Sequence, residues 1–353
     1  MPLRVPALQA FTTPSHPRAD SAFRHLKIAL LSDDLTRTGL SAECEVRNVT
    51  PLNAGLLLKL WRPSVLLVES AWNGVADSWK YKVAAYPDYP KRTNQRLAGL
   101  VRQARDMGIP TVFWNKEDGV HFERFIDSAK LFDHVFTVDV NCLPRYRAAM
   151  GADASVHTMM FPVQAATHNF TGFNFRHRRA SFVGSYSQHI HEARRVWQDM
   201  AFGAVTRTGL GLTVFDRNSG RKAGQYRYPD LPGLETKPAV PYAQTAQLYK
   251  DYLVSLNVNT VVDSETMYSR RLVEILACGG IAVTSPALSV DRLFRDYCHV
   301  ISTADEAVPL FERLQRDGAS ARDLERARGG AEYVLREHTW GQRLEQMGAV
   351  IGL

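Results

Sequence analysis

The sequence has no long apolar run, and its cysteines are few and scattered. No segment approaches the ~18–20 consecutive apolar residues that a membrane-spanning helix needs. The chain does not begin with a charged stretch followed by an apolar core, so no secretory signal is predicted. The four cysteines show no CxxC spacing: Cys44, Cys142, Cys278 and Cys298. This pattern predicts reduced thiols in a cytoplasmic protein rather than a disulfide framework or a zinc site.

Dense tracts of one charge are also missing. The 353 residues include 43 Lys and Arg against 36 Asp and Glu, which gives a net charge of +7. A positive balance favours anionic partners such as nucleotides, lipid head groups or nucleic acid. Nucleic acid is the less favoured of these because there is no lysine-rich tract. We therefore expect a cytoplasmic protein, with peripheral contact to the anionic inner face of a membrane as one option.

The common nucleotide-binding fingerprints are absent. No GxGxxG follows an expected strand, which disfavours a nicotinamide dehydrogenase, and no GxxxxGK[ST] occurs, which excludes a P-loop NTPase. His189 and His191 are two residues apart and do not share a helix face. We expect no metal site and no cofactor.

The length and the alternation of elements predict two domains. The expected fold class is α/β, with two Rossmann-like, doubly wound parallel-sheet domains facing across a cleft. The predicted parts are a flexible arm (1–24), a first Rossmann-like domain (25–165), a linker (166–178), a second Rossmann-like domain (179–337) and a C-terminal helix (338–353).

Short β-rich runs alternate with helical periodicity in both halves. Strands are expected at 27–32, 65–68, 111–114, 134–138, 156–161, 181–183, 212–215, 252–258, 281–284 and 299–301. Helices are expected at 51–60, 92–107, 143–150, 189–202, 243–251, 290–295, 304–316, 319–337 and 340–351. Residues 217–241 are rich in Gly and Pro and are predicted to form a loop, and the basic run 176–179 is assigned to the linker.

Polar side chains follow many of these strands at their carboxyl ends. Ligands of doubly wound sheets bind at these ends. The residues concerned are Glu69, Ser70, Asn115, Lys116, Glu117, Asp118, Asp139, Gly184, Ser185, Asn257, Asn259 and Ser285. Each predicted domain contributes one group of these strand-end residues, and the two groups together predict a ligand-binding cleft.

The most informative stretch runs from Ser269 to Ser285. Ser269 is expected to cap a short helix whose apolar stripe is followed by a glycine stop and a buried strand. Arg270 and Arg271 stand at the helix start, where exposed N–H groups favour an anion. Glu274 lies one turn later. The functional interpretation is that the arginines, with Ser269, Gly184 and Ser185, bind a diphosphate and Glu274 binds a ribose; the alternative is a plain Arg270–Glu274 ion pair.

A second polar cluster follows the strand at 111–114. Glu117, Asp118 and His121 are candidates for the catalytic group that takes a proton from an acceptor hydroxyl, and Glu69 competes for that role. The alternative is an ordinary turn in which Asp118 caps a helix. Acceptor contacts are expected from Trp72, Asn73, Asn115 and Lys116, with a filled core edge as the alternative for Trp72.

The stretch from Arg270 to Gly280 resembles the donor-binding motif of GT-B glycosyltransferases, and is most similar to the spore-maturation (CgeB-like) group. The tail 335–344 and the segments 112–118 and 132–137 are also similar to that group. The resemblance implies a nucleotide-sugar donor bound by the second domain (179–337), a glycan or lipid-linked acceptor bound by the first (25–165), and metal-independent transfer. It also implies that the last helix (338–353) crosses back to the first domain. It places Asn257, Asn259, Thr266, Met267 and Tyr268 near the donor sugar or base. Related retaining enzymes carry two glutamates separated by seven residues. Glu274 matches the second of them, whereas the first falls on Thr266, one position from Glu265.

The function expected from the sequence is a glycosyltransferase of cell-surface polysaccharide synthesis that uses a UDP-, GDP- or dTDP-sugar. Two alternatives remain open. One is a transferase that modifies nucleic-acid bases, and the other is a non-catalytic nucleotide- or sugar-binding maturation protein.

Overall fold

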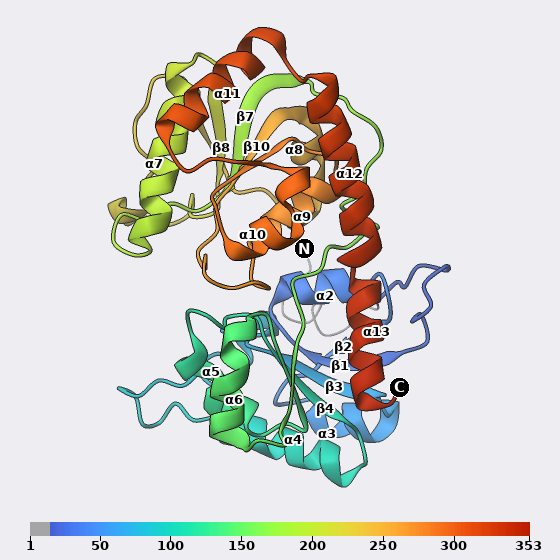
Figure 1. The fold of residues 1–353 in the computed structure, drawn as a ribbon. Coiled ribbons are helices and arrows are strands. Elements are labelled where there is room, and N and C mark those ends of the chain that lie inside the picture. The colour runs from blue at the N-terminus through green and yellow to red at the C-terminus, as the bar shows by residue number, and fades with distance from the viewer. Residues whose placement is uncertain (1–14) are drawn as a thin grey trace, which may run out of the picture. The chain divides into compact units, whose positions relative to one another are not determined.

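The computed structural model describes residues 15–353 and divides them into two compact units. The first unit comprises the described residues up to Gln164 together with Trp340–Leu353, and the second comprises Ala165–Thr339. Figure 1 shows a sheet flanked by helices in each unit. Within residues 15–353, no helix is both long enough and apolar enough to span a bilayer.

The first unit is built on a six-stranded parallel sheet. Its strands, in spatial order, are β2 (Glu45–Asn48), β1 (Lys27–Leu31), β3 (Val65–Glu69), β4 (Thr111–Asn115), β5 (His134–Thr137) and β6 (Ser155–Thr158). Its helices are α2 (Asp34–Leu40), α3 (Ala54–Leu56), α4 (Gln95–Asp106), α5 (Phe122–Ala129), α6 (Leu143–Met150) and α13 (Trp340–Ile351). Every residue of β3 and β4 is buried, as expected for a parallel sheet covered on both faces.

The second unit contains another six-stranded parallel sheet. Its strands, in spatial order, are β12 (His299–Val300), β11 (Ala282–Thr284), β10 (Tyr252–Asn257), β7 (His177–Gly184), β8 (Leu212–Asp216) and β9 (Leu234–Pro238). Its helices are α7 (Glu192–Arg207), α8 (Tyr242–Asp251), α9 (Arg270–Ala277), α10 (Leu288–Leu293), α11 (Ala304–Asp317) and α12 (Ala321–Glu337). Two doubly wound parallel sheets confirm the predicted Rossmann-like fold class.

The order of the strands reverses at one place in each sheet. In the first unit the chain starts at β1 and adds β2 on one side and β3 on the other. In the second unit the chain starts at β7, adds β8 and β9 on one side, and returns to add β10 on the other. Connections diverge at such a switch point and leave a crevice beyond the carboxyl ends of the two strands. The β1–β3 and β7–β10 pairs therefore mark where ligands of this fold bind.

Two of the four edge strands, β2 and β9, were missed by the sequence analysis. β9 lies inside the segment expected to be a loop, because its residues are polar and it pairs on one side only. β7 starts at His177, inside the expected linker, so assigning the basic run to a linker was wrong. Arg176 is bound to Asp251, with a distance of 2.9 Å from Nε to Oδ1, and Arg179 donates to the carbonyl oxygens of Leu212 and Gly233.

The predicted arm (1–24) is described only from residue 15 onward; its first fourteen residues lie outside the described part. Ser15 Oγ accepts a hydrogen bond from the Val46 amide at 2.9 Å. Ser21 Oγ donates to the buried carboxylate of Glu43 at 2.9 Å. Residues 15–24 are thus bound to the first unit by several hydrogen bonds.

The last helix, α13, belongs to the first unit although the residue before it belongs to the second. The Trp340 amide donates to the Val163 carbonyl at 3.1 Å, and the Trp340 ring packs against Trp114 with centroids 5.5 Å apart. A Cβ on Gly39 would lie 2.0 Å from the Trp340 indole nitrogen. Only glycine lets α2 approach this ring so closely.

Candidate functional site

The switch point of the second unit is bridged by Arg271. Its Nε donates to the carbonyl of Val183 near the end of β7 at 2.5 Å, and its Nη1 donates to Asn257 Oδ1 at the end of β10 at 3.3 Å. The guanidinium carbon also lies 4.6 Å from the centre of the Phe182 ring. Arg271 forms no ion pair with a carboxylate among residues 15–353. A cation held by neutral groups at a switch point is suited to bind an anionic ligand.

Gly184 makes this arrangement possible. A Cβ at this position would lie 2.7 Å from Arg271 Nη2 and 2.8 Å from the ring of Phe182. Gly184 is buried, whereas the neighbouring Ser185 is half-buried. The structure therefore brings together three of the predicted diphosphate ligands: Arg271, Gly184 and Ser185.

A second guanidinium, Arg194 on α7, faces the same place. Its Nη2 donates to the Ser185 carbonyl at 3.2 Å, and its Nη1 lies 3.4 Å from Thr260 Oγ1. Burial, followed by the charge of Arg271, lowers the pKa of Arg194 to about 10, and Arg217 acts in the same direction. No carboxylate forms an ion pair with Arg194 among residues 15–353. Adjacent cations without a counter-ion repel one another, and a bound anion would relieve that repulsion.

A buried hydroxyl completes the cluster. The Tyr228 oxygen is buried and has no hydrogen-bond partner in the described chain. Burial raises the pKa of Tyr228, so the group stays protonated and can donate. A buried donor beside two guanidiniums is suited to donate a hydrogen bond to an anionic ligand. We define Arg194, Arg217, Tyr228 and Arg271 as the arginine cluster.

A hollow of about 250 Å³ lies beside this cluster, between the loops that follow β7 and β8. Arg194, Arg217 and Arg221 line it together with Ser185 and Tyr226. The sequence analysis missed Arg194, Arg217 and Tyr228. Arg217 directly follows β8, so the rule of polar residues at strand ends could have found it. Arg194 and Tyr228 come from a helix and a loop without any motif.

Arg270 contacts different groups from those that the arginine cluster contacts. Its Nε is 3.6 Å from Glu274 Oε1, which is the alternative ion pair that the spacing allowed. The Glu274 side chain is only 7% exposed, and the Tyr249 hydroxyl donates to its Oε2 at 3.4 Å. Ser269 makes no side-chain cap bond, so that prediction was wrong; its amide donates to Asn259 Oδ1 at 3.0 Å. Ribose binding by Glu274 stays a prediction.

The remaining donor-side residues form a buried polar layer. Asn257 and Asn259 both donate to Thr284 Oγ1, at 2.9 and 3.2 Å. The amides of Thr266 and Met267 donate to Ser264 Oγ at 3.3 and 3.1 Å. These bonds set the path of the chain into α9.

Two further neighbours of this layer differ in their exposure. Tyr268 is buried and its hydroxyl is 2.9 Å from His338 Nδ1, so it lies in the core rather than at a ligand surface. Glu265 is exposed and paired with Arg292 at 2.6 Å.

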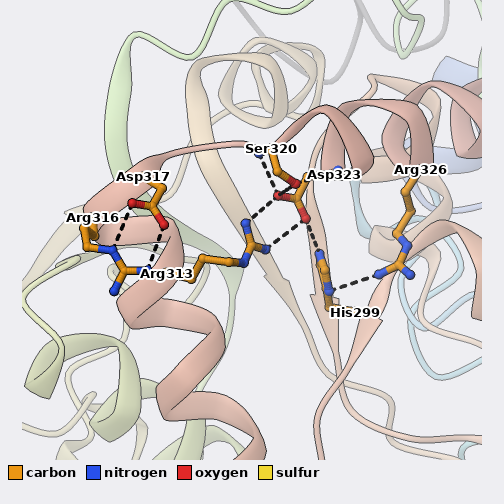
Figure 2. Close-up of polar contacts among 7 residues, drawn as sticks. All are labelled: His299, Arg313, Arg316, Asp317, Ser320, Asp323 and Arg326. Carbon is orange, nitrogen blue, oxygen red and sulfur yellow. Dashed lines mark hydrogen bonds and ion pairs between the residues drawn. The ribbon is translucent and has the colours of Figure 1, made fainter.

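A network of hydrogen bonds and ion pairs stabilises α12, the helix that packs against α9. Figure 2 shows Asp323 of α12 receiving hydrogen bonds from Arg313 at 2.8 Å, from His299 at 2.9 Å and from Ser320. Burial alone would raise the pKa of Asp323, but these hydrogen bonds outweigh it and hold the pKa well below its usual range. A Cβ added at Gly330 of α12 would lie 3.1 Å from Leu276 of α9. The network thus fixes the helix against which α9 packs.

In the first unit, Glu69 lies at the β1–β3 switch point and is fully buried. Its Oε1 accepts from the Asp33 amide at 2.6 Å and from Lys116 Nζ at 2.8 Å, and its Oε2 accepts from Thr36. The Asp33 carboxylate in turn accepts from the amides of residues 72–74. Both oxygens of Glu69 and the ammonium of Lys116 are therefore engaged in positioning loops.

Asp118 is also fully buried. It accepts hydrogen bonds from Asn115 at 2.7 Å and from the Tyr146 hydroxyl at 2.9 Å. Burial raises the pKa of Asp118 to about 7, although hydrogen bonds from Thr137 and Tyr146 lower it. The side chains of Asp118 and Asn115 are enclosed and do not reach solvent in this structure, and no side-chain cap bond is formed at the start of α5.

His121 and Trp72 lie side by side at the surface of the first unit. Their ring centres are 5.3 Å apart in an edge-to-face arrangement, and Trp72 also contacts Phe125. Asn73 is exposed, whereas Glu117, Trp72 and His121 are half-buried. Of the four predicted catalytic candidates, only Glu117 and His121 are open to solvent. Among residues 15–353, no three His, Cys, Asp or Glu side chains are arranged to hold a metal ion.

Residues 177–349 match a family model described as glycosyl transferase-like. No curated protein sequence is significantly similar to the chain.

Solved structures of similar fold include the DNA-modifying enzyme β-glucosyltransferase, with a TM-score of 0.55 at 9% identity, covering 93% of this chain and 99% of that one. Anabaena HepE in complex with UDP has a TM-score of 0.54 at 11% identity, covering 92% and 91%. TarM has a TM-score of 0.50 at 8% identity and covers 89% of this chain, which spans only 60% of TarM.

At such low identities these likenesses show the fold alone. The chain has the GT-B fold, and its second half carries a glycosyl transferase-like domain. Together these findings support a GT-B glycosyltransferase. Membership of the spore-maturation group stays a prediction.

Proposed function

We propose that the protein transfers a sugar from a nucleoside-diphosphate sugar to a hydroxyl of a glycan or lipid-linked acceptor, in cell-surface polysaccharide synthesis at the inner face of the membrane. The observation that carries this proposal is the arginine cluster at the β7–β10 switch point of the glycosyl transferase-like domain. Cleavage of a nucleotide sugar leaves a diphosphate, whose negative charge grows in the transition state. Arg194 and Arg271, which form no ion pair with a carboxylate among residues 15–353, would stabilise that charge.

The donor would lie with its diphosphate at Arg194, Arg271 and the amides after Gly184. Arg217 would reach the same oxygens from the loop after β8. Glu274 would accept the ribose hydroxyls, which requires its contact with Arg270 to loosen. Because guanidiniums supply the positive charge, we propose that transfer needs no divalent metal.

The acceptor would bind the first unit beside Trp72 and Asn73. His121 is the proposed base, since its ring nitrogens have no hydrogen-bond partner among residues 15–353 and imidazole is the commonest general base. Glu69 and Lys116 would hold the loop that carries Trp72. Glu117 is the second candidate. Asp118 would hold Asn115 and Tyr146 in place through its hydrogen bonds and so position the end of β4.

The test incubates the purified protein with UDP-, GDP- and dTDP-sugars and measures release of the nucleoside diphosphate, with and without EDTA. The proposal predicts slow hydrolysis of one donor that EDTA does not change. Loss of the activity in EDTA would refute the metal-free mechanism. A protein that binds a nucleotide sugar without ever cleaving it would instead be a non-catalytic binding protein.

The net charge of +7 keeps transfer to nucleic-acid bases as a second candidate. Addition of duplex DNA to the same assay separates the two. Incorporation of labelled sugar into DNA would favour this second candidate, and hydrolysis unaffected by DNA would count against it.

A further inference from the structure

The segment between β3 and α4 carries an aromatic and basic surface that neither the sequence motifs nor the donor site explains. Tyr81, Tyr86 and Tyr89 gather around Arg92, and Arg124 of α5 lies beside them. We call these five residues the tyrosine clamp.

Arg92 is held between two aromatic rings. Its guanidinium carbon is 3.8 Å from the centre of the Tyr81 ring and 3.9 Å from that of Tyr89. The Arg92 side chain makes no hydrogen bond or ion pair with any residue of the described chain. Stacking covers the faces of a guanidinium and leaves its N–H edge available. That edge matches a carboxylate or phosphate group in two parallel hydrogen bonds.

Local contacts hold the backbone of the tyrosine clamp in one conformation. Tyr81 has a φ of +63°, which a non-glycine residue adopts only when its surroundings enforce it. Its ring meets that of Tyr86 edge to face at 5.1 Å. Arg124 Nη1 donates to the Ala85 carbonyl at 3.0 Å, and the Ala85 amide donates to the Arg124 carbonyl at 2.6 Å. The loop is thus tied to α5, and its rings are preorganised.

A hollow of about 350 Å³ adjoins the tyrosine clamp, within the usual range of small-ligand pockets. Its lining includes Tyr86, Tyr89, Arg92 and Arg124. The one carboxylate in the lining, that of Asp127, is paired with Lys130 at 3.2 Å. Tyr89 is 52% exposed, so part of its ring is open to solvent near Arg92. Aromatic rings next to a cation suit a ligand that offers both a flat apolar face and an anionic group, as an acidic sugar does.

We propose that the tyrosine clamp is a subsite for an acidic glycan, in which a sugar ring packs on Tyr89 and a carboxylate or phosphate of the sugar binds Arg92. Resting on the proposed function, this assigns the acceptor to the class of anionic polysaccharides. The subsite extends the acceptor surface beyond Trp72 and Asn73 along the loop that they begin.

The test is calorimetric titration of the full-length protein, without donor, with tetragalacturonate and with its methyl ester, which keeps the rings and removes the charges. The acidic tetramer is expected to bind, and the ester at least about 10-fold more weakly. Arg92→Gln should weaken binding of the acid about 10-fold, and Tyr89→Leu about 5-fold. Arg102→Gln, which removes an exposed charge from α4 of the same unit, is the matched control and should bind like the wild type.

Several outcomes would overturn the assignment. These are no binding of the acidic tetramer, equal binding of acid and ester, or equal losses in the Arg92 and Arg102 variants. Competition by inorganic phosphate at the same concentration as the tetramer would show a site for a free anion rather than for a glycan. Binding to phosphatidylglycerol vesicles that depends on Arg92 while the tetramer does not bind would show a membrane-contact site.

Failure of this inference and failure of the proposed function are separable. The titration involves only the first unit and no donor, whereas donor cleavage depends on the arginine cluster of the second. Donor hydrolysis without glycan binding would remove the subsite and leave the transferase. Glycan binding without cleavage of any donor would leave the subsite and remove the transferase.

Discussion

At the scale of single residues, similar side chains differ in function because their partners differ. Arg270 and Arg271 are adjacent in sequence, yet Arg270 lies 3.6 Å from a carboxylate while Arg271 contacts only neutral oxygens and a ring. Asp118 and Glu117 are likewise adjacent, and only the first is enclosed. These differences in partners and burial are the basis on which we propose Arg271 as a ligand-binding residue and Asp118 as a structural one.

Arg271→Ala is expected to lower kcat about 100-fold, because removing one preorganised donor to a developing anion costs that much. The melting temperature should change little, since the side chain is half-buried and its two hydrogen bonds go to neutral groups. Steady-state kinetics and a thermal melt measure both effects. Arg207→Ala, at the exposed end of α7, is the control and should keep full activity. Undiminished turnover in the Arg271 variant would contradict its role.

Asp118 predicts an unusual dependence of stability on pH. Its pKa of about 7 in the folded protein lies above the value of 3.8 for an unperturbed aspartate, so the folded state holds the proton more tightly. Stability should therefore fall as pH rises between about 4 and 7, by a few kcal/mol at most. Asp118→Asn keeps the shape and cannot ionise, so it should remove this loss. Parallel urea titrations at pH 5 and pH 8 make the comparison, and an identical pH profile in both proteins would contradict it.

At the scale of elements, the approach of β7 to α9 depends on a residue without a side chain. Gly184→Ala would place a Cβ 2.7 Å from Arg271 Nη2, so the guanidinium must move away from the switch point. Donor affinity is expected to fall about 10-fold or more, with a smaller change in stability. Gly203→Ala provides the contrast, because a Cβ in that part of α7 meets nothing within 4 Å. That change should stabilise the helix by roughly 0.5–1 kcal/mol and leave donor binding unaltered.

The network around Asp323 holds α11, α12 and β12 together. Figure 2 also shows the separate Arg316–Asp317 pair, which serves as the control. Asp323→Ala removes a buried carboxylate that accepts hydrogen bonds from Arg313, His299 and Ser320, and should cost roughly 3 kcal/mol of unfolding free energy. Because its pKa is depressed in the folded state, this contribution is present above the unfolded pKa and is lost as pH falls through the folded one. Asp317→Ala breaks only an exposed pair with Arg316 and should cost nothing measurable. Equal urea midpoints for the two variants at pH 7 would contradict the account.

Most central elements were predictable because they are buried and short. Runs such as Val65–Val68 and Val112–Trp114 are apolar throughout and lie within strands of the structure. β2 and β9, two of the four edge strands, were missed because most of their residues are polar. The capping boxes at Thr303 and Ser320 mark α11 and α12 by local chemistry that a sequence carries directly.

The candidate site was also predictable in part, because some of its features are visible in the sequence. Gly184, Ser185 and Arg271 were found because strand ends and helix starts are visible in a sequence. Arg194 and Tyr228 were not, because only the folded sheet brings α7 and the loop after β8 to the same crevice. The enclosure of Glu69 and Asp118 was equally hidden, since burial of a strand-end carboxylate depends on the loops that cover it.

At the scale of the whole molecule, two sheets of similar size serve different chemistry at their switch points. The β7–β10 crevice contains Arg194 and Arg271, which form no ion pair with a carboxylate among residues 15–353, whereas the β1–β3 crevice contains the buried Glu69–Lys116 pair. The central claim is that a nucleoside diphosphate is bound by the first of these crevices.

Isothermal titration with UDP, GDP and dTDP tests this claim most directly, using the wild type, Arg194→Gln and Arg207→Gln. We predict that at least one nucleotide binds, that Arg194→Gln weakens it about 10-fold, and that Arg207→Gln, on the same helix, leaves the affinity unchanged. Absence of binding by all three nucleotides, or equal affinity in all three proteins, would contradict the account.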